Sequence, residues 1–153
     1  MVVLGLDPAS KCGWAVAGYK IHSGVWTLWD TKADKGEAKG VRYLRLLECQ
    51  EAVQDTASLD LIVYEQAHHR GAAATEYAYG YATHVQSFCA RHNIPFAKVH
   101  SGTVKKFATG SGKASKEEMV EAARARWSGF EPETDDEADA RFIALWGLEE
   151  YTG

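Results

Sequence analysis

The sequence is poor in three things that would point to a specialised class of protein: cysteine, long apolar runs and basic charge. Its cysteines, Cys12, Cys49 and Cys89, are scattered along the chain and show no CxxC spacing. This pattern argues against both a disulfide framework and a zinc site. No segment approaches the ~18 consecutive apolar residues that a transmembrane helix requires. We therefore expect no membrane association.

The N-terminus also lacks the features of a targeting signal. Met1 leads directly into a strand-like run, without a basic n-region or a small-residue cleavage site. This beginning predicts an intracellular, cytoplasmic protein. The chain has 153 residues, of which 46% are hydrophobic and 25% charged. We expect one globular domain over residues 1–153, large enough to bury a core without a staple.

The formal net charge of −4 would discourage a nucleic-acid partner if binding followed the charge of the whole protein. Binding follows local charge instead. A metal-dependent nuclease must itself carry several carboxylates, and bound cations reverse their sign where the substrate arrives. The acidic balance therefore leaves DNA binding open.

Apolar patterning predicts a mixed α/β sheet. Short apolar segments predict strands over residues 1–7, 13–18, 21–29, 59–65 and 95–99. The second and third strands flank a tight Tyr19-Lys20 connection, which favours an antiparallel hairpin. Helical spacing of apolar residues predicts helices over residues 41–57, 71–92, 115–127 and 134–151. Strands and helices in this order favour a sheet with helices on both faces.

Two of the expected helices begin with a capping box. Ser115 lies three residues before Glu118, and Thr134 lies three residues before Glu137. In each pair the hydroxyl and the carboxylate can satisfy each other's backbone N–H groups. The segment before Ser115, which contains Gly110 and Gly112, is expected to be a loop.

Four acidic residues occupy positions that are hard to explain as ordinary surface. Asp7 and Glu65 close two apolar strands, and Asp136 and Asp139 open the last helix, three residues apart on one face. A buried carboxylate is unfavourable unless a cation neutralises it. Functional groups also gather at strand ends in open α/β sheets. Together the four acids predict a site for two hard divalent cations, suited to phosphodiester hydrolysis.

Each acid also has an ordinary structural interpretation. Asp7 can form an Asx turn, Glu65 can pair with an arginine, and acids are favoured at a helix N-terminus. The helical pair has a second possible register as well, since Asp135 and Asp139 share a face almost as well as Asp136 and Asp139. The metal hypothesis therefore depends on the four positions taken together.

Four sequence blocks, in order over almost the whole chain, resemble a known family. They are Gly5-Leu6-Asp7-Pro8-Ala9-Ser10 with Gly13-Trp14-Ala15-Val16, then Tyr64-Glu65-Gln66, then Val104-Lys105-Lys106 with Gly110, Gly112, Ala114 and Lys116, then Asp136-Glu137-Ala138-Asp139-Ala140 with Ile143-Ala144. Any one block is a weak signal. In this order and spacing they resemble the RuvC-type Holliday-junction resolvases.

The resemblance implies an RNase H-like fold and a homodimer that cleaves branched DNA, such as a four-way junction, leaving 5′-phosphate and 3′-hydroxyl ends. By the same resemblance, two Mg²⁺ ions, replaceable by Mn²⁺, are held by Asp7, Glu65, Asp136 and Asp139. Lys105 is then a further catalytic residue near the scissile phosphate. The residues expected to contact DNA are Lys105, Lys106, Lys113, Lys116, His68, His69 and Arg70. The expected setting is a bacterial cell or a phage-infected host.

The segment after Glu65 departs from the family pattern. Members commonly place an aromatic or apolar residue there to probe the junction centre, whereas this chain has Ala67-His68-His69-Arg70. Histidine can stack on a base or meet a phosphate. The departure predicts a broader choice of branched DNA.

The helix over residues 71–92 has two interpretations. Its stripe of Ala73, Tyr77, Tyr81 and His84, bordered by Ala74, Ala78 and Gly80, suits a dimer interface. Aromatic stripes at helical spacing are more often core within one chain. The dimer is therefore expected mainly from the resemblance and from the two-fold symmetry of a four-way junction.

Two other functions are compatible with part of the pattern. The segment from Asp7 to Gly13 also resembles the first phosphate loop of actin-like and sugar-kinase-like proteins, but those need two domains with a cleft between them. A non-catalytic branched-DNA-binding protein could keep the same fold. Intact acids at all four positions make that alternative the weaker one.

Overall fold

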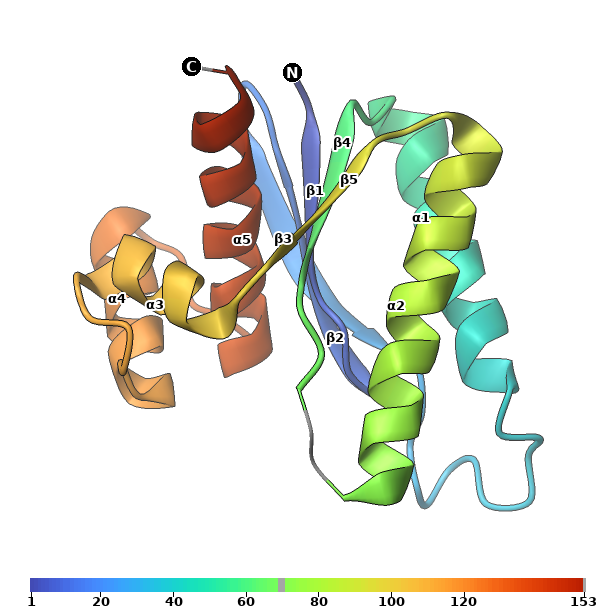
Figure 1. Ribbon diagram of the computed structural model, residues 1–153. Coiled ribbons are helices and arrows are strands. Elements are labelled where there is room, and N and C mark those ends of the chain that lie inside the picture. The colour runs from blue at the N-terminus through green and yellow to red at the C-terminus, as the bar shows by residue number, and fades with distance from the viewer. Residues whose placement is uncertain (69–70, 153) are drawn as a thin grey trace.

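The computed structural model describes residues 1–68 and 71–152 and contains one five-stranded sheet in the order β3-β2-β1-β4-β5. The strands are β1 (Val3–Asp7), β2 (Lys11–Ala17), β3 (Ile21–Thr27), β4 (Leu61–Glu65) and β5 (Phe96–Val99). The helices are α1 (Val41–Ala57), α2 (Ala72–His92), α3 (Ser101–Thr109), α4 (Lys116–Arg126) and α5 (Asp135–Thr152). Figure 1 shows α1 and α2 on one face of the sheet and α3, α4 and α5 on the other. The predicted mixed sheet with helices on both faces is confirmed.

The strand pairing centres on β1. This strand is antiparallel to β2 and parallel to β4, while β2 and β3 form the predicted hairpin and β4 runs parallel to β5. Because β1, β4 and β5 are parallel, their carboxyl ends meet at one edge of the sheet. Asp7 and Glu65 are the last residues of β1 and β4 and so lie at that edge.

Alternation along β1 separates two cores. Leu4 and Leu6 point toward α1 and α2 and pack with Ile62 and Tyr64 of β4. Val3 points the other way, into the core that α5 and α4 cover. Asp7 has the same parity as Val3, so its side chain also faces α5. The pleat of one strand thus sends the apolar leucines to one side and the acid to the other.

The sheet face under α5 carries unusually small residues. A Cβ atom built on Gly5 would lie 2.5 Å from the backbone nitrogen of Ala144, and one on Gly13 would lie 2.0 Å from the carbonyl oxygen of Asp136. Ala15, Ala17, Ala140 and Ala144 form a small buried cluster beside them. Helix α5 therefore approaches β1 and β2 closely enough for backbone to contact backbone.

One helix was missed by the sequence analysis. Residues Ser101–Thr109 were expected to belong to a connection but form α3, of which only Val104 is fully buried. The helix is only nine residues long, and His100 at its N-cap makes no side-chain capping bond, so neither length nor a start signal marked it in the sequence. This helix carries Lys105 and Lys106, so it matters for the site.

The two capping boxes have different outcomes. Ser115 and Glu118 form both reciprocal bonds, as predicted. At the start of α5 only half of the box forms, because Glu137 N–H donates to Thr134 Oγ1 at 3.3 Å but the Glu137 carboxylate does not return to Thr134. It accepts instead from Glu133 N–H at 2.7 Å and from Ser23 Oγ at 2.6 Å. The second box is thus wrong in its reciprocal half, since β3 supplies a competing donor.

The aromatic stripe of α2 packs within the chain. Tyr81 is buried and meets the edge of the Tyr43 ring on α1, and His84 stacks on Tyr43 with ring centroids 4.3 Å apart. Tyr77 lies under the guanidinium of Arg42. The core interpretation therefore holds for Tyr81, whereas Ala73 and His84 are exposed and Tyr77 is half-buried. No helix in the described ranges is long and apolar enough to cross a membrane.

We expect Gly13→Ala to destabilise the protein by roughly 1–3 kcal/mol, because the new methyl group overlaps the Asp136 carbonyl and must push α5 away from β2. The measurement is urea unfolding followed by circular dichroism. Gly40→Ala is the matched control, since nothing lies within 4 Å of a Cβ at that position. Equal stabilities of the two variants would contradict the close approach of α5.

Candidate metal centre

The centre begins with two carboxylates on neighbouring parallel strands. Leu6 of β1 is in register with Tyr64 of β4, so Asp7 and Glu65 follow side by side at the strand ends. Both have the parity that faces α5. Asp7 is 8% exposed, and Glu65 is half-buried. The sheet therefore presents two adjacent acids in a poorly solvated position.

Helix α5 adds two more carboxylates from above. Its first turn carries Asp135, Asp136 and Glu137, and Asp139 follows one turn later. Burial, the charges of Glu65, Asp139 and Asp136, and a hydrogen bond with Asp136 together raise the pKa of Asp7 well above its ordinary value. These interactions mean that all four predicted acids lie close to one another.

The pKa of Asp139 is raised as well. Burial is the main cause that raises the pKa of Asp139 to about 7, and the charges of Glu65, Asp135 and Asp136 add to it. The nearby Lys105 ammonium acts in the opposite direction. One oxygen of Asp139, Oδ1, is buried and has no hydrogen-bond partner in the described part of the chain. A cation beside Asp139 would stabilise its ionised form and give this oxygen a partner.

The donor set fits a hard divalent cation. Carboxylate oxygens are the ligands that Mg²⁺ and Mn²⁺ prefer, and a cation would relieve both the mutual repulsion and the orphaned oxygen of Asp139. Within residues 1–68 and 71–152, however, no three His, Cys, Asp or Glu side chains already stand in a coordinating arrangement. The acids are gathered, but their side chains would have to turn to coordinate an ion.

The structure distinguishes Asp136 from Asp135. Asp136 hydrogen-bonds with Asp7, the acid at the end of β1. Asp135 instead lines a shallow surface hollow together with Lys116 and Arg124. The two acids thus act on different partners, because Asp136 contacts Asp7 whereas the charge of Asp135 raises the pKa of Asp139 more than the charge of Asp136 does.

The predicted basic residues fall into three groups. Lys105 is half-buried on α3 and acts electrostatically on Asp139, so it lies at the centre. Lys106, Lys113 and Lys116 are exposed farther along α3, the following loop and the start of α4. His68 is exposed, and its Nε2 lies 4.0 Å from Glu65 Oε2. His69 and Arg70 lie outside the described residues.

The sequence analysis missed the residues that hold α5 in place. Gly13 is in register with Asp7 and lies directly under the Asp136 carbonyl. Ser23 Oγ donates to Glu137 and accepts from Arg141 Nε, at 2.6 Å in both cases, and so ties α5 to β3. A glycine within a strand is a signal of close backbone approach. Ser23 gave no such signal.

Comparison with known proteins gives consistent similarities, although no protein-family model matches the chain. A curated "Crossover junction endodeoxyribonuclease RuvC" of Anaeromyxobacter sp. (strain K) is 32% identical, over 97% of this chain and 80% of the relative. The protein of the same name from Rickettsia conorii is 29% identical, over 94% of both chains.

Solved structures agree on the fold. The structure titled "T. thermophilus RuvC in complex with Holliday junction substrate" matches with a TM-score of 0.78 and 24% identity, covering 95% of this chain and 91% of that one. The yeast mitochondrial Holliday junction resolvase Ydc2 matches with a TM-score of 0.61 and 14% identity, covering 97% of this chain and 80% of that one.

We expect the metal-free protein to lose stability as the pH rises from about 4 to about 7. In this window folded Asp139, whose pKa is about 7, keeps a proton that the unfolded chain releases near its ordinary value of 3.8. The free energy of unfolding should fall by roughly 1–3 kcal/mol. The measurement is urea unfolding in EDTA at several pH values.

Asp139→Asn should reduce this pH dependence, because the amide does not titrate in the window, while Asp7, whose pKa is also raised, keeps its own contribution. Asp55→Asn, which changes an exposed acid of α1, should leave the wild-type profile intact. Wild-type stability that rises between pH 4 and pH 7 would contradict the assigned direction.

Proposed function

The chain belongs to the RuvC family of crossover junction endodeoxyribonucleases, and from this membership we propose that it is a divalent-metal-dependent nuclease that resolves four-way DNA junctions or related branched DNA. The observation that carries the proposal is the convergence of Asp7, Glu65, Asp136 and Asp139 at the sheet edge, with raised pKa values for Asp7 and Asp139. Such a cluster destabilises the metal-free fold, and bound cations would neutralise the carboxylates for a role in catalysis.

In this proposal the four acids hold two Mg²⁺ ions, which Mn²⁺ can replace. When bound, the ions supply Lewis-acid stabilisation and an activated water for phosphodiester hydrolysis, leaving 5′-phosphate and 3′-hydroxyl ends. Asp7 and Glu65 are fixed by paired strands, while Asp136 and Asp139 are fixed by the first turns of α5. The rigid backbone keeps the carboxylates together despite their repulsion.

The cations of the chain would position the substrate. Lys105, beside Asp139, is placed to hold the scissile phosphate as a point charge. Lys106, Lys113 and Lys116 would contact the backbone farther along the same strand. His68 would meet the DNA beside Glu65, and His69 and Arg70, which follow it in the sequence, are proposed as further DNA contacts.

We further propose that the enzyme acts as a cytoplasmic homodimer. A two-fold dimer can place two metal centres on the two symmetric strands of a four-way junction. Tyr81 of the α2 stripe is buried against α1, whereas Ala73, Ala74 and His84 are exposed, so this helix still offers surface for such a dimer.

The alternatives have less support. The actin-like or sugar-kinase-like interpretation needs a second domain across a cleft, whereas the structure here has one five-stranded sheet. A non-catalytic DNA-binding protein has no need for acids whose burial destabilises the fold. Cleavage of a panel of four-way, three-way, flap and linear DNAs separates these functions.

We expect Asp7→Asn to reduce junction cleavage in Mg²⁺ by roughly a thousandfold or more, because it removes an anionic ligand of the ions that stabilise the transition state. Junction binding should persist. Gel assays of cleavage and binding on the same labelled four-way junction measure both properties. Undiminished cleavage by the variant would refute the assignment of Asp7.

The neighbours Asp135 and Asp136 offer a matched pair of variants. We expect Asp136→Asn to abolish cleavage, because Asp136 is the residue that contacts Asp7. Asp135→Asn removes the same charge one residue away and should retain most of the activity. The comparison is the single-turnover rate at saturating enzyme. The reverse order of rates would assign the ligand to Asp135.

A further inference from the structure

A basic segment lies apart from the cations already discussed. Residues 28–45 contain five Lys and Arg against three Asp and Glu, whereas the whole chain contains 17 against 21. Lys32, Lys35 and Lys39 are exposed, and none of them forms an ion pair within the described ranges. The local excess of positive charge therefore faces solvent.

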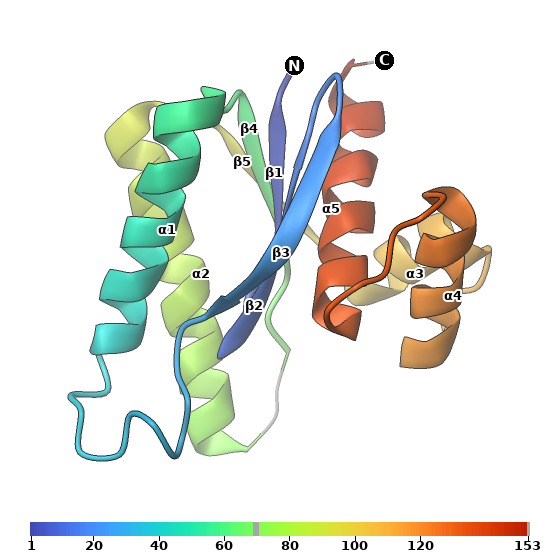
Figure 2. The same ribbon diagram turned by 180° about the vertical axis from the view of Figure 1, so that it is seen from behind.

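The segment leaves the sheet at the edge that carries the acids. Leu28 N–H and Trp29 N–H both donate to the carbonyl of Ser10, at 2.7 and 3.2 Å, just after Asp7 on the chain. Lys11 is in register with Thr27, the last residue of β3. Figures 1 and 2 both show the loop after β3 at the same end of the molecule as the N-terminal end of α2. The loop thus begins at the same end of the sheet as the candidate metal centre, on the side of α1 and α2.

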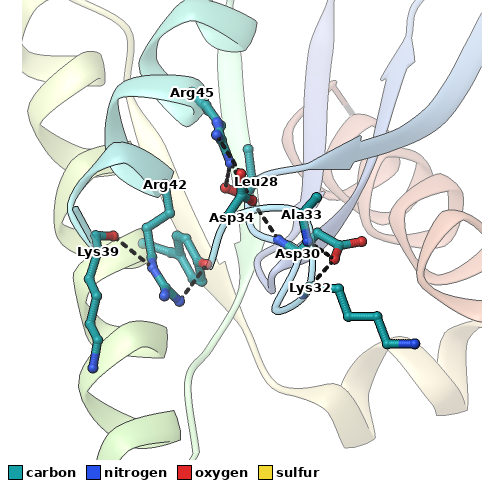
Figure 3. A network of polar contacts seen from close by, with 9 residues as sticks. Leu28, Asp30, Lys32, Ala33, Asp34, Lys39, Arg42 and Arg45 are labelled. Atoms are coloured by element: carbon teal, nitrogen blue, oxygen red, sulfur yellow. Dashed lines mark hydrogen bonds and ion pairs between the residues drawn. The ribbon is translucent and has the colours of Figure 1, made fainter. Parts of the chain in front are cut away.

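The loop is held in one conformation by its own acids. Asp30 Oδ1 accepts from the N–H groups of Lys32 and Ala33, both at 2.9 Å. Asp34 is buried and accepts two bonds from Arg45, at 2.7 and 2.9 Å. Figure 3 shows these contacts and shows the side chains of Lys32 and Lys39 extending away from them. Asp34 therefore faces inward, Asp30 is tied to the backbone of its own loop, and Glu37 is the one acid that shares the exposed surface with Lys32, Lys35 and Lys39.

A buried arginine anchors the other end of the loop. Arg42 is 3% exposed and lies between the Trp29 and Tyr77 rings, 4.4 and 3.6 Å from their centroids. Its Nε donates to the carbonyl of Lys39 at 2.9 Å, which fixes the backbone of that lysine. Helix α1 begins here with no acid in its first turn and no side-chain cap, so its positive end adds to the local potential.

We propose that Lys11, Lys32, Lys35 and Lys39 form a second basic surface, which binds the sugar-phosphate backbone of a DNA arm beside the metal centre. The proposal rests on the proposed nuclease function. Phosphate contacts need only well-placed cations. A protein partner would need an apolar anchor, and no large hydrophobic side chain of residues 28–40 is among the exposed ones of the described residues, although Leu44 in α1 is exposed.

The surface complements the lysines of α3 and α4. Those lie on the α5 side of the sheet, whereas this loop leads into α1 on the opposite side (Figure 1). A junction arm that crosses the sheet edge would then meet cations on both sides of four repelling acids. The net charge of −4 makes such local attraction necessary for binding.

The test measures affinity for a four-way junction as a function of KCl concentration. Lys32→Gln and Lys39→Gln are made singly and together in the Asp7→Asn background, where cleavage does not interfere. Each lysine that contacts a phosphate should lower affinity roughly three- to tenfold and reduce the salt slope by about 1. The double variant should reduce the slope by about 2.

Lys20→Gln is the matched control, because Lys20 is exposed in the turn between β2 and β3 at the opposite edge of the sheet. An unchanged slope in the double variant, or an equal loss in the control, would overturn the proposal. Cleavage of the junction by the otherwise unaltered protein in Mg²⁺ is assayed in parallel. Absence of that cleavage would count against the nuclease function itself, and so the two failures are distinguishable.

Discussion

The structure depends on how closely α5 approaches the central strands. Gly5 and Gly13 leave no side chain between β1, β2 and the helix, and a Cβ on Gly147 would lie 2.6 Å from Val63 Cγ2 of β4. The alanines between them keep the same face flat. Because backbone meets backbone, the first turns of α5 cannot shift without a clash. This constraint brings Asp136 and Asp139 onto the strand-end acids.

The close packing of α5 on the sheet brings several carboxylates together, and these like charges repel one another. Burial and mutual repulsion raise the pKa values of Asp7 and Asp139, so the ionised cluster lowers the stability of the metal-free fold. The surrounding contacts offset this effect, among them the Ser23 link between Glu137 and Arg141 and the capping bond from Thr134. A site that is strained without its ions can gain folding stability when they bind.

Basic side chains lie on both faces of the sheet, near the end that carries the acids. Lys105 lies beside Asp139 on α3, and the loop of Lys32 and Lys39 leads into α1 on the opposite face of the sheet. Within that loop the carboxylates of Asp30 and Asp34 accept hydrogen bonds from backbone N–H groups and from Arg45, whereas Glu37 is exposed. A chain with an overall negative charge thereby presents cations where a DNA backbone would lie.

The sequence alone determined the element types, the hairpin and the four acids, because strand and helix periodicities and strand-end carboxylates are local signals. It did not predict α3, which is only nine residues long and has no side-chain cap at its start. Nor could it say how Asp135 and Asp136 are turned relative to the strand-end acids, which depends on the rotation of α5 about its axis. Only the tertiary structure decided that rotation, since it follows from contacts of Gly13 and Ser23 with residues more than 100 positions away.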